Sequence, residues 1–330
     1  MRSIYYLMFF GSILFTACKT EPVFPIEETI TLELMPLQGI TCPFRLEVKN
    51  PFLIVQNNQR TDSLFHIYDL NNHKLKSTFG VIGRGPNEFL YPVLYRTQLS
   101  DVAIIDWHND FLTYKFSIDE EGTAVLQETK LPNYIYGIAN SGFINDTLLV
   151  VDDFISSPNL HILSFNDELP KKSWQYGDPT IMNRFIDANQ GTVYANNSRI
   201  VFCYGLKKQI DFMDIDLNHI KRVEFSYTPV AISEQNQSDA AVTYSTGYLG
   251  KRYFYALFHG VPLKEYRDLS FRGSILEVFD LDGNPVIKYH FDHTSPDFFV
   301  VDEQTFTLYG GRYDGEPEDC LLVYKLKGLS

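Results

Sequence analysis

Residues 64–72 read LFHIYDLNN, an apolar strand that ends in a turn-forming run of Asp and Asn, and this pattern decides the fold. The pattern returns as LTYKFSIDEEG (112–122), LHILSFNDE (160–168), IDFMDIDLN (210–218), ILEVFDLDGN (275–284) and LLVYKLKG (321–328). With Tyr68, Phe116, Phe165, Asp214, Phe279 and Tyr324 taken as equivalent, the separations are 48, 49, 49, 65 and 45 residues. A period of about 40 to 50 residues is typical of four-stranded units that bury their faces only against one another. The sequence therefore predicts an all-β fold, a six-bladed β-propeller of four-stranded antiparallel blades.

Each repeat also contains an earlier apolar run. These runs are PFLIVQ (51–56), DVAIIDW (101–107), TLLVVDD (147–153), RIVFCYG (199–205), RYFYALF (252–258) and TFTLYGG (305–311). Short continuous apolar runs are typical of strands that are buried on both faces. We expect them to be the second strands of the blades, between neighbouring blades. Residues 280–284 (DLDGN) are predicted to form a hairpin turn rather than a calcium loop, which needs about twelve residues with a distal Glu.

The last repeat ends a few residues after its third strand, at Ser330, so it has no outer strand of its own. Residues 29–35 (TITLELM) form a lone alternating strand before the first repeat. A propeller has to close its ring and protect its edges. The N-terminal strand is therefore predicted to complete blade six, and its loss should open the ring.

The N-terminus has the anatomy of an export signal. Arg2 precedes an apolar stretch at residues 4–15, which is too short for a spanning helix of about 20 residues. Small residues stand just before Cys18, and the segment resembles a bacterial lipoprotein signal, which implies that Cys18 is lipidated. Ordinary cleavage is the alternative. The predicted domains are a signal peptide at 1–17, a tether at 18–28 and the propeller at 29–330.

Composition narrows the choice of partner. The formal net charge is −13 and 15% of residues are aromatic. Nucleic acid and anionic lipid both attract basic surfaces, so we expect no nucleic-acid partner and a membrane contact through the lipid anchor alone. The other cysteines are Cys42, Cys203 and Cys320; a Cys42–Cys320 bridge and three buried thiols are both compatible with the sequence.

One loop connects the sequence to a known family. Residues 80–89 read GVIGRGPNEF, and Pro92 follows closely. This segment resembles the glycine-rich motif between blades of TolB-like and NHL-like six-bladed propellers found in secreted lipoproteins of Bacteroidota. The resemblance implies an exported protein, anchored by lipid to the outer membrane on its periplasmic face or at the cell surface. Arg84 and Glu88 in this loop either form a pair that holds it in place or face the channel.

Propeller ligands usually bind at one end of the central channel, on loops held by the rigid ring. If the glycine-rich loop marks that end, the loops between second and third strands share it. The longest of them spans residues 259–273, and its length is expected to account for the 65-residue separation. Long loops in compact domains are often functional. The channel-mouth candidates are Arg84, Glu88, Trp107, His108, Asp153, Tyr204, His259, Tyr266, Arg267, Arg312 and Tyr313. Their aromatic and charged side chains suit a sugar or peptide, although a merely polar rim would look the same.

The sequence contains no catalytic, phosphate-binding or paired-cysteine metal motif, and we predict no cofactor and no metal. The favoured function is a lipid-anchored module of the cell envelope that binds or scaffolds a protein or glycan partner. The alternative is a metal-dependent propeller hydrolase or lyase acting on a sugar or lactone. In that alternative Asp106, Asp152 and Asp153 form a carboxylate cluster near the ends of buried strands.

Overall fold

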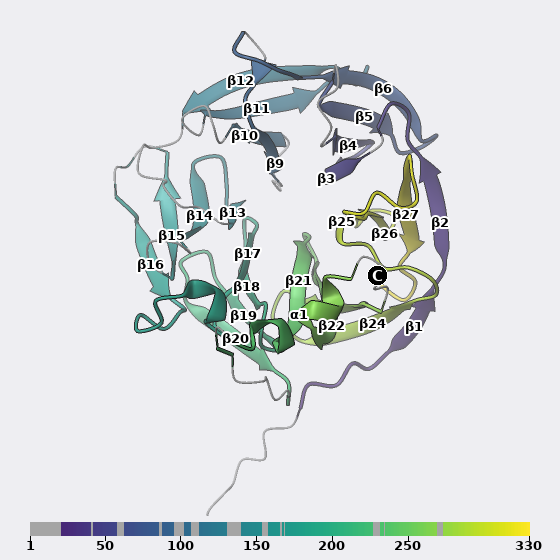
Figure 1. Cartoon of the computed structure of the whole chain (residues 1–330). Coiled ribbons are helices and arrows are strands. Elements are labelled where there is room, and N and C mark those ends of the chain that lie inside the picture. The colour runs from purple at the N-terminus through teal and green to yellow at the C-terminus, as the bar shows by residue number, and fades with distance from the viewer. Residues whose placement is uncertain are drawn as a thin grey trace, which may run out of the picture.

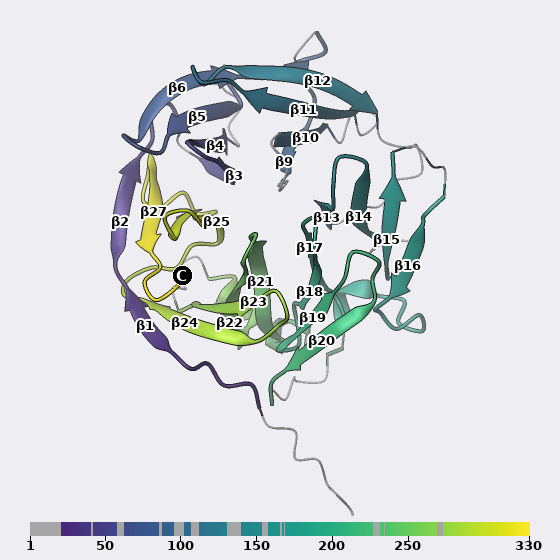
Figure 2. The same cartoon turned by 180° about the vertical axis from the view of Figure 1, so that it is seen from behind.

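The computed structural model describes residues 21–40, 42–57, 63–85, 88–95, 102–106, 112–130, 140–153, 158–165, 167, 169–226, 232–233, 235–268 and 273–330. Their strands form six antiparallel blades arranged radially around one axis, as the sequence predicts (Figure 1, and Figure 2 from behind). Within blades one to five the four strands of the blade follow one another from the innermost outward, whereas the outermost strand of blade six comes from the N-terminal end of the chain.

Blades one to three contain, from the centre outward, β3 (Pro43–Lys49), β4 (Phe52–Asn57), β5 (Phe65–Asp69) and β6 (Lys74–Phe79); β9 (Pro92–Tyr95), β10 (Val102–Asp106), β11 (Leu112–Ile118) and β12 (Ala124–Lys130); and β13 (Asn140–Phe143), β14 (Leu148–Asp153), β15 (Asn159–Ser164) and β16 (Lys172–Gln175). The short strands β7 (Val81–Ile82) and β8 (Glu88–Phe89) pair between blades one and two.

Blades four to six contain β17 (Gly191–Ala195), β18 (Ile200–Tyr204), β19 (Gln209–Met213) and β20 (His219–Glu224); β21 (Ala241–Leu249), β22 (Tyr253–Pro262), β23 (Ile275–Asp280) and β24 (Pro285–Phe291); and β25 (Phe298–Asp302), β26 (Thr307–Gly311), β27 (Cys320–Lys325) and β2 (Leu32–Pro36). Short helices at η1 (Arg184–Ile186), η2 (Gln237–Asp239) and α1 (Leu263–Tyr266) lie in the connections.

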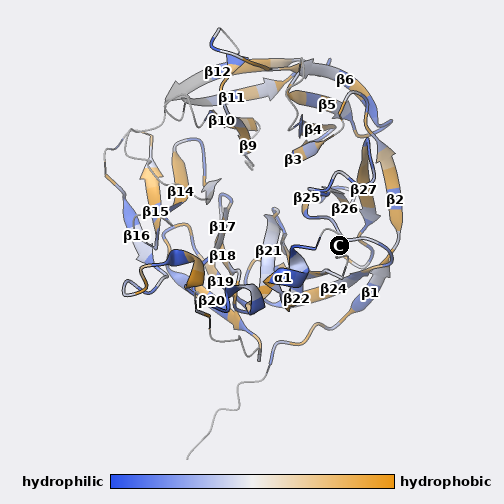
Figure 3. Ribbon diagram, in the orientation of Figure 1, coloured by the Kyte–Doolittle hydropathy of each residue, from blue (hydrophilic) through white to orange (hydrophobic). Residues whose placement is uncertain are grey.

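The apolar runs of the sequence are the second strands, and they are largely buried. Every residue of β4, β10, β18 and β26 is buried, whereas the outer strand β6 alternates between exposed and half-buried side chains. Figure 3 shows hydrophobic residues alternating with polar ones along strands around the whole ring. The sequence prediction for these strands is confirmed.

The hydrophobic core lies between neighbouring blades. One buried cluster joins blades one and two, where the ring of Phe79 packs edge-on against Phe116 with 4.9 Å between centroids. Another joins blades three and four, where Trp174 contacts Phe202 at 5.7 Å. Burying one such side chain stabilises the fold by about 1.5–3 kcal/mol, so each blade depends on its neighbours.

The N-terminal segment closes the ring, as predicted for blade six. β2 pairs antiparallel with β27, from Leu32 opposite Tyr324 to Pro36 opposite Cys320. The segment also forms a second pairing that the sequence did not predict. β1 (Glu27–Ile30) pairs parallel with β24 on the outer edge of blade five. The predicted single strand is therefore two strands on two blades (Figure 1).

The contact with the propeller begins before the first strand. Phe24 is buried, stacks on Phe225 at 6.2 Å and meets Phe279 edge-on at 5.4 Å. The part of the predicted tether from Phe24 onward thus packs on the ring.

The turn at residues 280–284 is the predicted hairpin. Asp280 Oδ1 accepts hydrogen bonds from the backbone N–H groups of Asp282 at 3.0 Å and Asn284 at 2.7 Å, and Gly283 has a φ of +78°. An Asp that binds its own turn, followed by a residue with positive φ, is typical of hairpins. The Asp280 carboxylate therefore stabilises the turn.

The 65-residue spacing comes from several segments, of which the predicted long connection between the second and third strands is one. His259 is not in a loop, because β22 continues to Pro262 and the chain then enters α1. The strands β21 and β22 are nine and ten residues long, and residues 225–240 separate β20 from β21. The longer strands and the connection before blade five therefore contribute to the spacing together with residues 263–274, which join β22 to β23.

Cys42, Cys203 and Cys320 are free thiols. Cys203 is fully buried in β18, and burial raises the pKa of its thiol well above the usual value. The Cys42–Cys320 bridge that the sequence left open is not formed.

Candidate functional site

The glycine-rich loop is held together by its own glutamate. Glu88 Oε2 accepts a hydrogen bond from the backbone N–H of Gly85 at 2.6 Å, and a Cβ added to Gly83 would lie 1.9 Å from the same oxygen. A side chain at position 83 would therefore displace the carboxylate from this hydrogen bond. Arg84 is exposed and makes no ion pair with the described residues, so the predicted Arg84–Glu88 pair is wrong.

The carboxylates proposed for a metal are used by the fold. Asp106 accepts the backbone N–H groups of Leu90 at 2.8 Å and Tyr91 at 2.7 Å, and so fixes the entry into β9. Asp152 accepts the Tyr176 hydroxyl at 2.5 Å. Within the described part of the chain, no three His, Cys, Asp or Glu side chains form a group that could hold a metal ion. The predicted cluster of Asp106, Asp152 and Asp153 is therefore not formed.

Asp153 is half-buried and lies 3.9 Å from His161 Nε2. Tyr204 is buried, and its hydroxyl donates to Asp211 Oδ2 at 2.8 Å. Arg222 binds the same carboxylate through two nitrogens, at 2.7 and 2.8 Å. Burial, and then the Asp211 charge, raise the pKa of the Tyr204 phenol. Its hydroxyl is committed to this buried ion pair.

Arg312 holds a neighbouring carboxylate, that of Asp297, in place. Its guanidinium is buried, binds Asp314 through Nε and Nη2, and lies with Nη1 3.4 Å from Asp297 Oδ1. The backbone N–H of Tyr313 donates to Asp297 Oδ2 at 2.9 Å. These contacts fix Asp297, which the sequence analysis did not select.

His259 forms a neutral polar cluster beside the channel. Its ring nitrogens Nε2 and Nδ1 hydrogen-bond with the hydroxyls of Ser245 and Ser274, the second at 2.6 Å, and Tyr266 packs on its ring at 4.5 Å. Burial lowers the pKa of His259 to about 3, so the imidazole is uncharged near neutral pH. A bulge in β21 lies at Ser245, and bulges commonly redirect side chains near functional sites. Arg267 is exposed at the end of α1.

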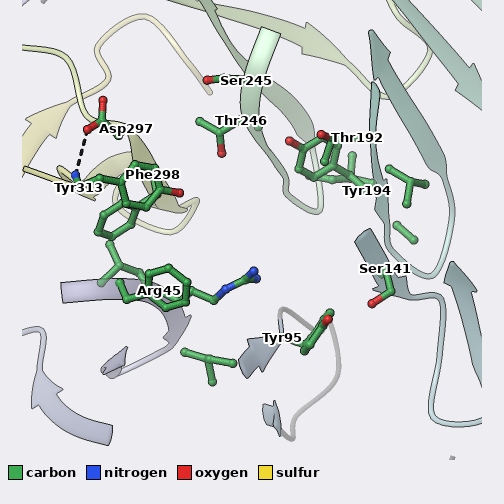
Figure 4. A pocket seen from close by; sticks show the side chains of 18 of the residues that line it. Arg45, Tyr95, Ser141, Thr192, Tyr194, Ser245, Thr246, Asp297, Phe298 and Tyr313 are labelled. Carbon is green, nitrogen blue, oxygen red and sulfur yellow. Dashed lines mark hydrogen bonds between the residues drawn. The ribbon is translucent and has the colours of Figure 1, made fainter. Parts of the chain in front are cut away.

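A cavity of ≈ 270 Å³ lies on the axis of the ring, and the innermost strands of all six blades contribute to its wall (Figure 4). Two predicted residues, Tyr266 and Tyr313, line it. The other lining residues are Phe44, Arg45, Leu46, Leu94, Tyr95, Ser141, Gly142, Thr192, Val193, Tyr194, Ala195, Ser245, Thr246, Gly247, Leu249, Asp297 and Phe298. The site is thus built mainly from the inner strands rather than from the loops that the sequence favoured.

Trp107, His108 and the predicted lipidation residue Cys18 lie outside the described residues. Of the other predictions, Arg84, Glu88, Asp153, Tyr204, His259, Arg267 and Arg312 do not line the cavity, although His259 and Arg312 contact residues that do. Figure 4 shows Arg45 extending from its strand into the cavity, with Tyr95 and Tyr194 on other blades. No local sequence signal distinguishes these residues, because the direction in which an inner strand's faces point depends on the closure of the ring.

Comparison with known proteins agrees with this architecture. Residues 24–304 match the family described as TolB-like 6-blade propeller-like, and the chain belongs to this family. The structure is similar to that of a protein described as exported from Bacteroides fragilis, with a TM-score of 0.56 and 9% identity over 92% of this chain and 99% of that one. A member of the DUF4221 family from Bacteroides vulgatus gives a TM-score of 0.57 and 13% identity over 91% and 98%. Identities this low show a shared fold alone.

No curated protein matches the chain. No helix formed by the described residues has the length and hydropathy needed to cross a membrane.

Proposed function

We propose that this protein is a binding module of the cell envelope that holds part of a protein or glycan partner in its axial cavity. The observation that carries the proposal is the wall of that cavity, to which all six blades contribute aromatic, hydroxyl and charged side chains. Small-molecule sites are concave and combine apolar walls with a few placed polar groups. The cavity has this composition.

The rigidity of the ring supports the same function. Asp297 is held by Arg312 and by the Tyr313 backbone, and Ser245 is held by His259. A site whose polar groups are already fixed loses less conformational entropy when a ligand binds. The fold of this family is also consistent with a role in protein interaction or scaffolding. A larger partner could then insert one of its groups into the cavity.

Export and anchoring complete the proposal. The N-terminal sequence has the anatomy of a lipoprotein signal, and one structural neighbour is described as an exported protein. We propose that Cys18 carries lipid and attaches the ring to the outer membrane. The stretch from Cys18 to the first buried residue, Phe24, is then the tether.

A glycan array and capture from envelope extract test the function, using the immobilised mature chain (residues 18–330). Thr246→Trp adds a large ring to the cavity wall, and Val125→Trp adds the same ring to the exposed face of the outer strand β12. We expect binding to be lost in Thr246→Trp and kept in Val125→Trp. Equal binding by both variants and the parent would show that the partner binds elsewhere.

A further inference from the structure

Arg45 is the unusual residue of the cavity. Among the described residues that line it, Arg45 and Asp297 are the charged ones. Asp297 is bound by Arg312 and by the backbone of Tyr313, whereas Arg45 makes no ion pair or hydrogen bond with the described residues. Its side chain is exposed to the cavity (Figure 4). The positive charge is therefore available to a ligand.

Aromatic rings position this charge. The guanidinium carbon of Arg45 lies 5.5 Å from the centroid of the Phe44 ring and 5.7 Å from that of Tyr95. Such cation–π contacts use the flat face of the guanidinium and leave its N–H edge for hydrogen bonds. That edge matches a carboxylate, because Arg presents parallel N–H donors that bind both oxygens.

The rest of the wall suits a body that carries hydroxyl groups. Ser141, Thr192, Ser245 and Thr246 line the cavity from three blades. The Ser141 hydroxyl is buried and has no hydrogen-bond partner among the described residues. A buried hydroxyl without a partner is costly, and a ligand hydroxyl would supply one.

Aromatic faces complete the wall on the other blades. Phe298 packs on Tyr313 with 5.2 Å between ring centroids, and Tyr313 lies 6.5 Å from Phe44. Ring faces of this kind pack against the C–H faces of sugars. The fixed Asp297 carboxylate accepts hydrogen bonds from hydroxyl groups, and near neutral pH it repels a second acidic group.

We propose that the cavity binds an acidic sugar, a uronic acid residue whose carboxylate pairs with Arg45 and whose hydroxyls bond to Ser141, Thr246 and Asp297. This inference rests on the proposed function, since it names the ligand class of the same cavity. An acidic peptide would also satisfy Arg45. Among the described lining residues, the four Ser and Thr hydroxyls and the single available cation favour a ligand with one carboxylate and several hydroxyls.

Isothermal titration calorimetry of the mature chain with galacturonosyl-galactose, a disaccharide with one carboxylate, and with the neutral disaccharide galactobiose tests the proposal. We expect galacturonosyl-galactose to bind at least about tenfold more tightly, because a paired carboxylate adds a charge-assisted bidentate contact. Arg45→Gln should remove this preference, so that the acidic and the neutral disaccharide bind the variant with about equal affinity. Arg84→Gln is the matched control, because Arg84 is also exposed and forms no ion pair with the described residues, but does not line the cavity.

The outcomes separate this inference from the proposed function. Equal affinity for the two disaccharides, or an equal loss in Arg84→Gln and Arg45→Gln, would overturn the acidic-sugar assignment. If Thr246→Trp still abolished galactobiose binding, the cavity would remain a binding site of another class. Binding of N-acetylglutamate amide in place of either sugar, lost in Arg45→Gln, would assign the site to an acidic peptide and overturn the proposal. If neither disaccharide bound, the acidic-sugar assignment and the proposal that the cavity holds a glycan would both be contradicted.

Discussion

Replacing Met35 by Ala should destabilise the closed ring while leaving its surface unchanged. Met35 is fully buried in β2, opposite Leu321 of β27, within the cluster that joins the first and last blades. A Met-to-Ala change in a packed core costs about 2–5 kcal/mol, because transfer energy and cavity energy add. We expect about 3 kcal/mol, since the strand is continuous and its neighbours come from two blades. At about 2 °C for each kcal/mol in a domain of this size, Tm should fall by about 6 °C.

The adjacent residue provides the control. Leu34 belongs to the same strand but is 50% exposed, because successive side chains of a strand point to opposite faces. Leu34→Ala should change stability by less than about 0.5 kcal/mol. Thermal unfolding followed by circular dichroism measures both variants. Equal Tm values for the two variants would refute the register of β2, and with it the closure of the ring through blade six.

Three further perturbations test buried polar groups. Asp106→Ala removes an acceptor from two backbone N–H groups, so chemical denaturation should show a loss of about 3 kcal/mol, and EDTA should not change the parent's stability. Tyr244→Phe removes the donor to the buried Glu277 and should cost about 1.5–3 kcal/mol, with Tyr244→Leu as a larger loss for comparison. The folded pKa of His259, about 3, is below the ordinary value of 6.5, so the unfolded chain binds more protons between these values. The contribution of His259 to the free energy of unfolding should therefore be fully present above pH 6.5 and be lost as the pH decreases toward 3. An equally steep loss of stability in a His259→Gln variant would show that other groups cause this pH dependence.

Much of the fold could be predicted because its elements follow local rules. The second strands are apolar on both faces, the outer strands alternate, and turns such as residues 280–284 contain the Asp and Gly that hairpins need. These signals repeat at a nearly constant period, which defines the ring. The missing outer strand of the last repeat then required a strand from the other end of the chain.

The strand β1 could not be predicted in the same way. Its pairing with β24 is parallel and joins residues about 260 positions apart, from Glu27 opposite Lys288 to Ile30 opposite Phe291. Local patterning shows that a segment is extended but does not specify its partner. The break at Thr31, where the chain passes from blade five to blade six, depends on the three-dimensional position of both blades.

The candidate site was predicted only in part, since sequence analysis favoured loops with charged and aromatic residues. Several of these side chains turned out to be tied to the fold. Tyr204 binds Asp211, Glu88 binds its own loop, and Arg312 is buried in an ion pair. Arg45 and Tyr95 belong to short inner strands, whose polar faces point to the axis only because the ring exists. Nothing in their local sequence distinguishes them from a solvent-exposed strand face.

Hydrogen–deuterium exchange of the mature chain most directly tests the central claim that the axial cavity is the binding site. Exchange would be followed by mass spectrometry with and without a saturating mixture of galacturonosyl-galactose and galactobiose. We predict slower exchange in peptides that cover the cavity segments of β3, β9, β17 and β21, and no change in the outer strands β6, β12 and β20. Protection confined to the outer strands, or no protection anywhere, would contradict the account.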